Sequence, residues 1–520
     1  MDYGSKQSFS SAEKLLIKTL VPLGNLKYKS VKRKYEDKFL TVKEICNMAD
    51  IDISQLNDLA KKALDQKVSG AYRASSRFIK DCVCVQLYED GDGIMRWAAS
   101  HGAKVCVTSH NIEDVPCIVS ENPASVYANI CSYYRRRNPI EATTIVGSIG
   151  KTTTKKMVEA VYKAQFETFC DAGNDNQIDG VGYFAQHIPN KSKKWVQEVS
   201  EDTPGCIKEI SKIVMPSINI VTAIDKSHIQ EYGDENGILD EIRSIKEGMG
   251  EDAVNIVSKD EENTANLFSK EDNVIFVSIK DEQADYYAKD IVIKNDGMHF
   301  SITDKKQNRD FAVFLPNVYA EHNAYSALYA FAAGVCTGVS YDNIIKGLSL
   351  YKPMGIRQNV YLAKGMTVYA DCYNAVAKSI RSAVEACDAI PVSGKRIAVI
   401  GDVEEAGDFS EAVHKEIIEI INNSKFDVLL TFGEKTAQAV KTSEIRSDLE
   451  VKSFLDKGKL NSEIRRHIEK DGLILFKASH KSRLDTSIAA VFKTAYLKNI
   501  VKSSLPQITH RIKVIKSWTV

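Results

Sequence analysis

The chain has 520 residues, with 69 basic and 69 acidic side chains, and therefore a formal net charge of zero at neutral pH. This length predicts about two to four domains, and the balanced charge gives no electrostatic reason to expect a nucleic-acid or membrane-surface partner. The 11 cysteines show no C-x-x-C pair and no metal-ligand spacing, which indicates a reducing, cytoplasmic compartment.

The first region, residues 1–140, mixes short helical and strand patterns. Its first 39 residues lack the apolar core and the cleavage site of a secretion signal, and no stretch of the chain reaches the roughly 18 apolar residues that a membrane span needs. Strands are predicted at 81–87 and 103–108, with a helix over 93–101 between them. The region is therefore predicted to be a small α/β domain.

A glycine-containing loop opens the second region, residues 141–353. A strand pattern over 143–146 runs into the loop Gly147-Ser148-Ile149-Gly150 and then into a helix that starts Lys151-Thr152-Thr153. The two glycines allow backbone N–H groups to surround an anion, the helix adds its positive dipole end, and Lys151 can reach the terminal phosphates of a nucleotide. The Thr152 hydroxyl is then available to a magnesium ion.

This loop is shorter than the usual P-loop, because the position of the first glycine in that pattern is Ile145 here. An ordinary glycine turn between a strand and a helix is the alternative interpretation. The Gly-Lys-Thr sequence in a strand-to-helix context favours the nucleotide-phosphate site.

Two further strands in this region end in candidate metal ligands. A strand over 194–200 places Glu198 near its carboxyl end, and a strand over 218–224 leads into a loop that contains His228. Because the carboxyl ends of parallel strands meet at one edge of a sheet, we expect both side chains beside the phosphate loop. Carboxylate oxygens are hard ligands, so Thr152, Glu198 and His228 are predicted to bind Mg²⁺. Taken alone, Glu198 and His228 could each be a surface group.

The third region, residues 354–520, alternates strand and helix patterns, which predicts a parallel, Rossmann-like sheet. Strands are expected at 366–370, 396–400, 428–432 and 473–476, and helices at 379–389, 410–422 and 484–498. The second strand ends at Gly401-Asp402, and the fourth runs into the loop Lys477–Arg483. Both loops are positions where a second ligand could be held.

The order of these residues resembles the Mur ligase family, ATP-dependent enzymes that add amino acids to the peptide of the peptidoglycan precursor, and most closely the branch that adds D-alanyl-D-alanine. The markers are the loop 147–152, Gly173-Asn174-Asp175-Asn176, Glu198, His228, His322-Asn323, Arg357, Asp371-Cys372-Tyr373-Asn374-Ala375, Gly401-Asp402 and Lys477-Ala478-Ser479. The resemblance implies three α/β domains, at 1–140, 141–353 and 354–520, in a cytoplasmic monomer. It implies ATP and Mg²⁺, with a UDP-MurNAc-peptide-like carboxylate and an amino acid or dipeptide as substrates.

The resemblance also implies roles for individual residues. Lys151 would hold the β- and γ-phosphates, Thr152 one magnesium ion, and Glu198 with His228 a second one. The other expected contacts are to ATP from Gly147, Ser148, Gly150, Thr153, Asn323, Arg357 and Asp371, to the amine substrate from Asn374, Asp402, Lys477, Ser479 and Arg483, and to a UDP-sugar from Ser76 and Arg77.

The chain departs from the family pattern at four places. The family's carbamylated lysine, which braces the second magnesium, falls at Ile242, and Lys246 lies about one helical turn further on. Ser75 stands where the family's UDP-sugar element has an acid, and Val376-Ala377 replace the family's Asn-Pro. The glycine that the family has before His322-Asn323 is not found. Two alternatives follow, a Mur-like ligase for a different carboxylate acceptor and a nucleotide-binding relative without catalysis.

Overall fold

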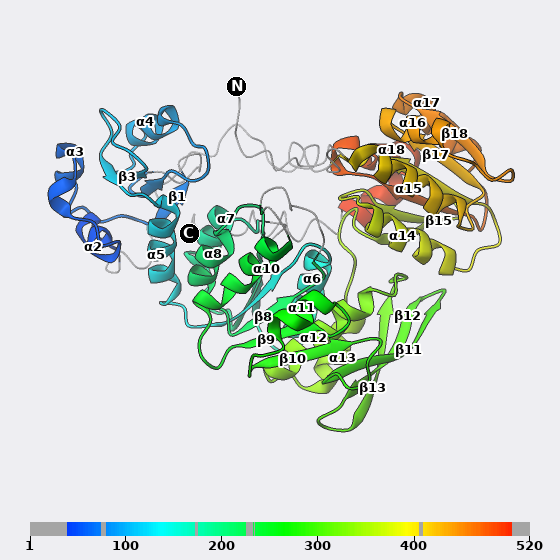
Figure 1. The fold of residues 1–520 in the computed structure, drawn as a ribbon, viewed down its shortest axis with the longest axis horizontal. Coiled ribbons are helices and arrows are strands. Elements are labelled where there is room, and N and C mark those ends of the chain that lie inside the picture. The colour runs from blue at the N-terminus through cyan, green and yellow to red at the C-terminus, as the bar shows by residue number, and fades with distance from the viewer. Residues whose placement is uncertain are drawn as a thin grey trace.

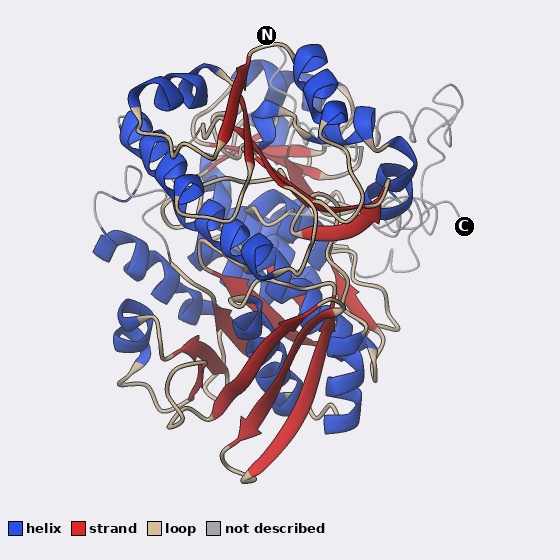
Figure 2. Ribbon diagram, turned by 90° about the vertical axis from the view of Figure 1, so that its right-hand side faces the viewer, coloured by secondary structure: helices blue, strands red, loops and turns tan. Residues whose placement is uncertain are grey.

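The structure is a computed structural model that describes residues 39–73, 80–171, 175–224, 232, 235–404 and 409–501. Within these residues the chain forms three β-sheets, of four, nine and six strands, which follow one another along the sequence. Figure 1 shows them as three bodies, coloured blue to cyan, cyan to yellow-green, and yellow to red. Figure 2 shows that helices cover the sheets. The predicted three-part α/β architecture is confirmed.

The N-terminal sheet is small and parallel, in the order β1-β2-β3-β4. Its strands are β1 (Ala71–Arg73), β2 (Val83–Val85), β3 (Val105–Thr108) and β4 (Cys117–Val119), and its helical segments are α2 (Val42–Met48), η2 (Ile53–Gln55), α3 (Asp58–Lys61), α4 (Asp92–Ser100) and α5 (Pro123–Arg135). Helix α2 begins at a capping box, in which Thr41 and Glu44 each accept the other's backbone N–H. The predicted strands and the predicted helix of this region lie at β2, β3 and α4.

Helix α5 fixes the N-terminal body to the central one. The Ser132 hydroxyl donates to the Lys212 carbonyl at 2.7 Å, and Arg135 Nε donates to the Val214 carbonyl at 3.1 Å. Both carbonyls belong to the last turn of α8 (Cys206–Val214). A single hydrophobic core continues from the N-terminal sheet through α5 to α8, so the two bodies are packed together and not only tethered.

The central sheet has the order β13-β12-β11-β10-β9-β8-β5-β7-β6. Its strands are β5 (Glu141–Val146), β6 (Thr168–Cys170), β7 (Lys194–Glu198), β8 (Ile218–Val221), β9 (Val254–Ser258), β10 (Val274–Ser278), β11 (Tyr286–Lys294), β12 (Gly297–Asp304) and β13 (Arg309–Pro316). Its helical segments are α6 (Lys151–Lys163), α7 (Ile178–Ala185), α8, α10 (Glu235–Arg243), η3 (Ser244–Gly248), α11 (Glu262–Phe268), α12 (Asn323–Cys336) and α13 (Tyr341–Ser349). The first seven strands pair in parallel, and β12 and β13 add an antiparallel extension.

The position of β5 explains where a ligand can reach the sheet. β5 lies between β7 and β8, with Thr143 opposite Val196 on one side and Ile218 on the other. All five residues from Ala142 to Val146 are buried, so the strand is covered on both faces by helices. The loop 147–150 therefore leaves the sheet at its carboxyl edge, flanked by the ends of two neighbouring strands.

The C-terminal sheet has the order β14-β15-β19-β16-β17-β18, parallel except for the β14–β15 pair. Its strands are β14 (Asn359–Ala363), β15 (Met366–Asp371), β16 (Arg396–Gly401), β17 (Val428–Phe432), β18 (Glu450–Phe454) and β19 (Leu473–Lys477). Its helical segments are α14 (Ala377–Ala389), α15 (Ser410–Asn422), α16 (Glu434–Thr442), α17 (Lys457–Arg466), η5 (His480–Ser482), α18 (Asp485–Val491), α19 (Lys493–Tyr496) and η6 (Leu497–Val501). The four predicted strands are confirmed, and the helix predicted over 484–498 is divided into shorter segments.

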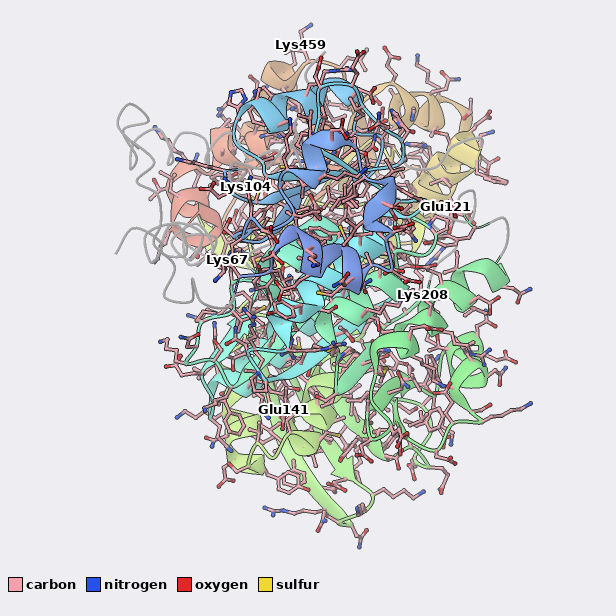
Figure 3. All side chains as sticks on the ribbon, turned by 90° about the vertical axis from the view of Figure 1, so that its left-hand side faces the viewer. Lys67, Lys104, Glu121, Glu141, Lys208 and Lys459 are labelled. Carbon is pink, nitrogen blue, oxygen red and sulfur yellow. The ribbon has the colours of Figure 1, made fainter. Side chains whose placement is uncertain are left out.

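Charged side chains of both signs lie on the surface of the N-terminal and central bodies, among them Lys104, Glu121, Glu141 and Lys208 (Figure 3). This mixture agrees with the net charge of zero and gives no single-sign field on the face shown. Among the described residues, no helix combines the length and the apolar character needed to cross a lipid bilayer.

Candidate active site

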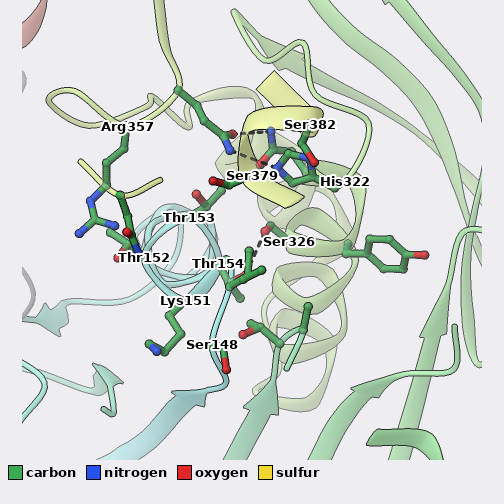
Figure 4. A pocket seen from close by; sticks show the side chains of 18 of the residues that line it. Ser148, Lys151, Thr152, Thr153, Thr154, His322, Ser326, Arg357, Ser379 and Ser382 are labelled. Atoms are coloured by element: carbon green, nitrogen blue, oxygen red, sulfur yellow. Dashed lines mark hydrogen bonds between the residues drawn. The ribbon is translucent and has the colours of Figure 1, made fainter. Parts of the chain in front are cut away.

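A pocket of about 470 Å³ lies between the central and C-terminal bodies. The central body contributes the loop after β5, the first turn of α6, the end of β7 and the start of α12. The C-terminal body contributes Arg357, Gln358, Asp371 and Lys477. Figure 4 shows Lys151 and Thr152 on the left of this pocket with Arg357 above them, and His322 to the right beside Ser379 and Ser382.

The loop between β5 and α6 requires its first glycine. Gly147 has φ +119°, and a Cβ atom there would lie 2.5 Å from Thr222 Oγ1 and 2.9 Å from the Thr222 carbonyl oxygen. The N–H groups of Ser148 and Ile149 donate to the Ala223 carbonyl, each at 3.0 Å, which ties the loop to the end of β8. Gly150, at φ +90°, turns the chain into α6, whose first N–H groups have no acceptor within the helix and suit an anion.

Lys151 is held by an acid that the sequence analysis did not single out. Its Nζ atom lies 2.7 and 2.9 Å from the two carboxylate oxygens of Glu201 and also contacts the Gly147 carbonyl oxygen. The Lys151 side chain is 13% exposed and that of Glu201 only 3%. The only sequence signal for Glu201 is its place in the loop directly after β7, three residues beyond Glu198.

Glu198 receives three polar contacts at the bottom of the pocket. Its Oε2 atom accepts from the Thr152 hydroxyl at 3.0 Å and lies 3.2 Å from Lys155 Nζ, and its Oε1 atom accepts from Asn176 Nδ2 at 3.2 Å. Burial opposes the charge, but the ammonium groups of Lys155 and Lys151 and the Arg357 guanidinium lower the pKa of Glu198 below its ordinary value. Glu198 is therefore an ionised carboxylate beside a hydroxyl at the edge of the phosphate loop.

Lys155, like Glu201, is a residue of the site that was not predicted from the sequence. Its side chain is fully buried, and its Nζ atom donates to Asp171 Oδ2 at 2.6 Å as well as facing Glu198. Burial disfavours the ammonium form, yet the two carboxylates raise the pKa of Lys155 above its ordinary value. Burial raises the pKa of Asp171 to about 6, against the opposing effect of Lys155. One buried cation thus lies between two buried acids.

The donor set at the phosphate loop fits a magnesium ion. A threonine hydroxyl and an ionised carboxylate, 3.0 Å apart and both lining the pocket, are oxygen ligands of the kind that Mg²⁺ binds together with phosphate oxygens. The predicted third ligand, His228, lies outside the described residues. Lys246 does not line the pocket, and its ammonium pairs with Glu271. Ile242 is buried in the hydrophobic core.

The far side of the pocket is built from α12 and the first strands of the C-terminal body. Asn323 Nδ2 donates to Gln358 Oε1 at 2.9 Å, and Gln358 Nε2 lies 3.1 Å from His322 Nε2. Burial lowers the pKa of His322 to about 4, helped by Lys477 and opposed by Asp371. His322 is therefore a neutral imidazole at physiological pH, and the three side chains present hydrogen-bonding groups to the pocket.

Asp371 and Lys477 form the ion pair at the C-terminal edge of the pocket. Lys477 Nζ donates to Asp371 Oδ2 at 2.8 Å and to the Asn374 carbonyl oxygen at 2.7 Å. The guanidinium of Arg357 lies over the Tyr373 ring, 3.4 Å from its centroid. The end of β15 and the end of β19, which are neighbours in the sheet, thus bring both charges to one place.

The remaining predicted residues of the C-terminal body lie outside the pocket lining. Asp402 caps α16, because its Oδ1 atom accepts from both the N–H and the hydroxyl of Thr436 at 2.8 Å. Ser479 Oγ accepts from the Glu404 N–H at 3.2 Å, and Arg483 Nε donates to Asp485 at 3.0 Å. Their contact with an amine substrate stays a prediction.

The structure brings most of the predicted site residues together and leaves others apart. Those that line the pocket are Ser148, Gly150, Lys151, Thr152, Thr153, Glu198, Asn323, Arg357, Asp371, Asn374 and Lys477. Gly147 shapes the loop beside it. Ser76 and Arg77, predicted to contact a UDP-sugar, lie outside the described residues, as His228 does.

The fold and the site define a three-body α/β protein whose pocket includes a glycine loop after β5, the third strand from one edge of its largest sheet. Two family models match the chain, the Mur ligase middle domain over residues 145–334 and the Mur ligase, glutamate ligase domain over residues 356–480. The chain belongs to the Mur ligase family.

Two curated relatives show the extent of the similarity. The UDP-N-acetylmuramoyl-tripeptide--D-alanyl-D-alanine ligase of Bacillus subtilis is 27% identical over 402 residues, which cover 76% of this chain and 86% of that protein. The ligase of the same name from Escherichia coli is 24% identical over 456 residues, or 85% of this chain and 99% of that protein.

Solved structures agree on the fold. The crystal structure of MurF from Acinetobacter baumannii matches with a TM-score of 0.72 and 22% identity, covering 88% of this chain and 99% of that one. The MurF ligase from Thermotoga maritima in complex with ADP matches with a TM-score of 0.70 and 21% identity, covering 85% and 99%. The chain therefore has the Mur ligase fold over nearly the whole length of these proteins.

Proposed function

We propose that this chain is an ATP-dependent amide ligase, which activates the terminal carboxylate of a UDP-MurNAc-tripeptide as an acyl phosphate and joins it to D-alanyl-D-alanine. The observation that carries the proposal is the pocket between the central and C-terminal bodies, which holds Lys151, Thr152 and Glu198 opposite Asn323 and Asp371. The names of the curated relatives support the choice of substrates.

The first half of the reaction transfers the γ-phosphoryl group of ATP to the carboxylate. Such a transfer depends on positioning and on neutralising negative charge, more than on covalent help from the protein. Lys151 and the first N–H groups of α6 are the groups that would hold the phosphates. Thr152, Glu198 and His228 would hold Mg²⁺, and the ion when bound neutralises charge on the phosphate oxygens.

The second half of the reaction is attack by the amine on the acyl phosphate, which releases phosphate. The amine must lose its proton before or during attack, and its approach must exclude water, because water would hydrolyse the acyl phosphate. We assign Asn323, Arg357 and Asp371 to ATP, and Asn374, Asp402, Lys477, Ser479 and Arg483 to the C-terminal side from which the amine arrives. Closure of the C-terminal body over the pocket would bring the two together.

The proposal extends to the organisation of the chain. We assign residues 1–140 to binding the UDP-linked substrate through Ser76 and Arg77, residues 141–353 to ATP, and residues 354–520 to the amine. We further propose that the protein acts as a monomer in the cytoplasm.

Phosphate release measured across a matrix of UDP-MurNAc-peptides and amines tests this function. We expect turnover only when ATP, a UDP-MurNAc-tripeptide and D-alanyl-D-alanine are all present. Lys151→Ala should reduce turnover at least about a hundredfold, since removing one preorganised charge-stabilising contact costs on the order of 3 kcal/mol. Turnover with a carboxylate that carries no UDP group, and none with UDP-MurNAc-peptides, would refute the substrate assignment.

A further inference from the structure

Glu201 forms an ion pair with Lys151, the lysine that is proposed to bind the nucleotide phosphates. Glu201 approaches Lys151 Nζ with both carboxylate oxygens, at 2.7 and 2.9 Å, and its side chain is 3% exposed. The backbone of Glu201 is fixed as well, because the Tyr232 hydroxyl donates to its carbonyl oxygen at 2.7 Å. In this structure Glu201 is therefore the anion that Lys151 binds.

Phosphates that enter the loop compete with Glu201 for Lys151. Once Lys151 turns to the phosphates, Glu201 is a buried carboxylate close to further negative charge, an arrangement that is strongly unfavourable without a new cation. Two other buried ammonium groups of the site are already engaged, Lys155 by Asp171 and Glu198, and Lys477 by Asp371. The protein side of the pocket thus offers Glu201 no replacement partner among these groups.

Glu201 also lies in the same pocket as the two residues that are proposed to bind Mg²⁺, Thr152 and Glu198. It follows Glu198 by three residues on the loop after β7, and both carboxylates line the same pocket as the Thr152 hydroxyl. Carboxylate oxygens are ligands that Mg²⁺ binds together with nucleotide phosphates.

We propose that Glu201 is a metal-positioning carboxylate, which pairs with Lys151 in the free enzyme and turns to the Mg²⁺ that arrives with the nucleotide. The inference rests on the proposed binding of ATP in this pocket. Its consequence is an exchange of partners: Lys151 passes from Glu201 to the phosphates, and Glu201 passes from Lys151 to the metal. Magnesium then increases nucleotide affinity by a larger factor than it would if only Thr152 and Glu198 bound the ion.

Calorimetric titration of the full-length protein with ADP, in EDTA and in excess Mg²⁺, tests the exchange through Glu201→Gln. Removing the competing charge should tighten metal-free ADP binding about tenfold, and removing the metal ligand should weaken binding in Mg²⁺ about tenfold, each corresponding to a free-energy change near 1.4 kcal/mol. The ratio of the two dissociation constants, which measures magnesium enhancement, should therefore fall about a hundredfold.

Asp202→Asn is the matched control, because Asp202 is the adjacent acid of the same loop and accepts from Gln177 Nε2 at 3.0 Å without contacting Lys151. Its magnesium enhancement should equal that of the wild type. Should Glu201→Gln fail to fold, Glu201→Asp is measured in the same way and should also lower the enhancement, since it withdraws the carboxylate by one methylene.

The possible outcomes distinguish failure of this inference from failure of the proposed function on which it rests. Equal tightening of ADP in EDTA and in Mg²⁺ would show that Glu201 only competes for Lys151, and equal weakening would show a structural role; either result overturns the inference and leaves the proposed function standing. Failure of the wild-type protein to bind ADP under both conditions would overturn both. Electron paramagnetic resonance of Mn²⁺ in the ADP complex should show weaker metal binding by Glu201→Gln.

Discussion

Replacing Lys155 by methionine tests the electrostatic arrangement beneath the phosphate loop. Methionine has a similar length and no charge, so Lys155→Met removes the cation and leaves the packing volume nearly unchanged. Asp171 and Glu198, whose side chains are 0% and 4% exposed, would then lose the ammonium that pairs with both of them. Removal of one partner from a buried ion pair costs about 3–5 kcal/mol, and here two acids lose the same partner.

The loss should depend on pH in a defined direction. Burial already raises the pKa of Asp171 to about 6, above its ordinary value of 3.8, although Lys155 counteracts this rise. A carboxyl group whose pKa is higher in the folded state binds protons preferentially when folded, so lowering the pH favours folding and raising it disfavours folding. Without Lys155 the pKa of Asp171 rises further. The variant should therefore be least stable above that pKa and regain stability as the pH falls towards about 6.

Differential scanning calorimetry with and without ADP provides the measurement. A chain of three bodies need not unfold in one step, so the relevant transition is the one that ADP shifts. We expect Lys155→Met to lower its midpoint by roughly 5–10 °C near pH 8, by less near pH 6, and Lys155→Met combined with Asp171→Asn to recover part of the loss. A variant as stable as the wild type at both pH values would refute the argument that Lys155 neutralises these acids.

Three further predictions concern other parts of the site. Gly147→Ala should abolish ADP binding and lower stability, because its Cβ would lie 2.5 Å from Thr222 Oγ1. The control is Gly205→Ala, at φ +80° with open space around it, which should lower the free energy of unfolding by only about 1 kcal/mol. Calorimetry compares the two variants. Because burial lowers the pKa of His322 to about 4, the wild type should lose stability as the pH falls from 6.5 towards that value, and His322→Gln should lose less over this window in thermal melts. Lys246→Ala should keep nearly full ligase turnover, since Lys246 pairs with Glu271; loss of turnover that acetate restores would contradict this.

The sequence was sufficient to predict the parts of the fold in which a local pattern determines the structure. The Gly147–Thr152 loop is recognisable because a positive-φ turn, a helix start and a lysine must follow one another in the chain. By contrast, β18 (Glu450–Phe454) was missed, since it is a largely exposed edge strand with charged residues and no apolar alternation. Strands β11 and β12 were missed as well, although they form a long antiparallel pair.

The parts of the site that escaped prediction depend on partners far apart in sequence. Lys155 looked like a continuation of a polar helix surface, and lysines are seldom fully buried. Only the structure shows that α6 points it at Asp171 and Glu198. Glu201 became informative in the same way, through its contact with Lys151, fifty residues earlier in the chain. The sequence also did not show that the Asp402 carboxylate accepts a hydrogen bond from the Thr436 N–H at the start of α16, since that partner lies 34 residues further along the chain.

Transfer of ¹⁸O from substrate to phosphate tests the central claim most directly. A UDP-MurNAc-tripeptide labelled with ¹⁸O in its terminal carboxylate is incubated with the enzyme, ATP, Mg²⁺ and D-alanyl-D-alanine, and the released phosphate and the amide product are examined by mass spectrometry. Activation as an acyl phosphate predicts that each phosphate released with a pentapeptide product carries a single ¹⁸O atom. Phosphate without ¹⁸O, or ATP hydrolysis with no amide product, would contradict the proposal that this chain is a carboxylate-activating ligase.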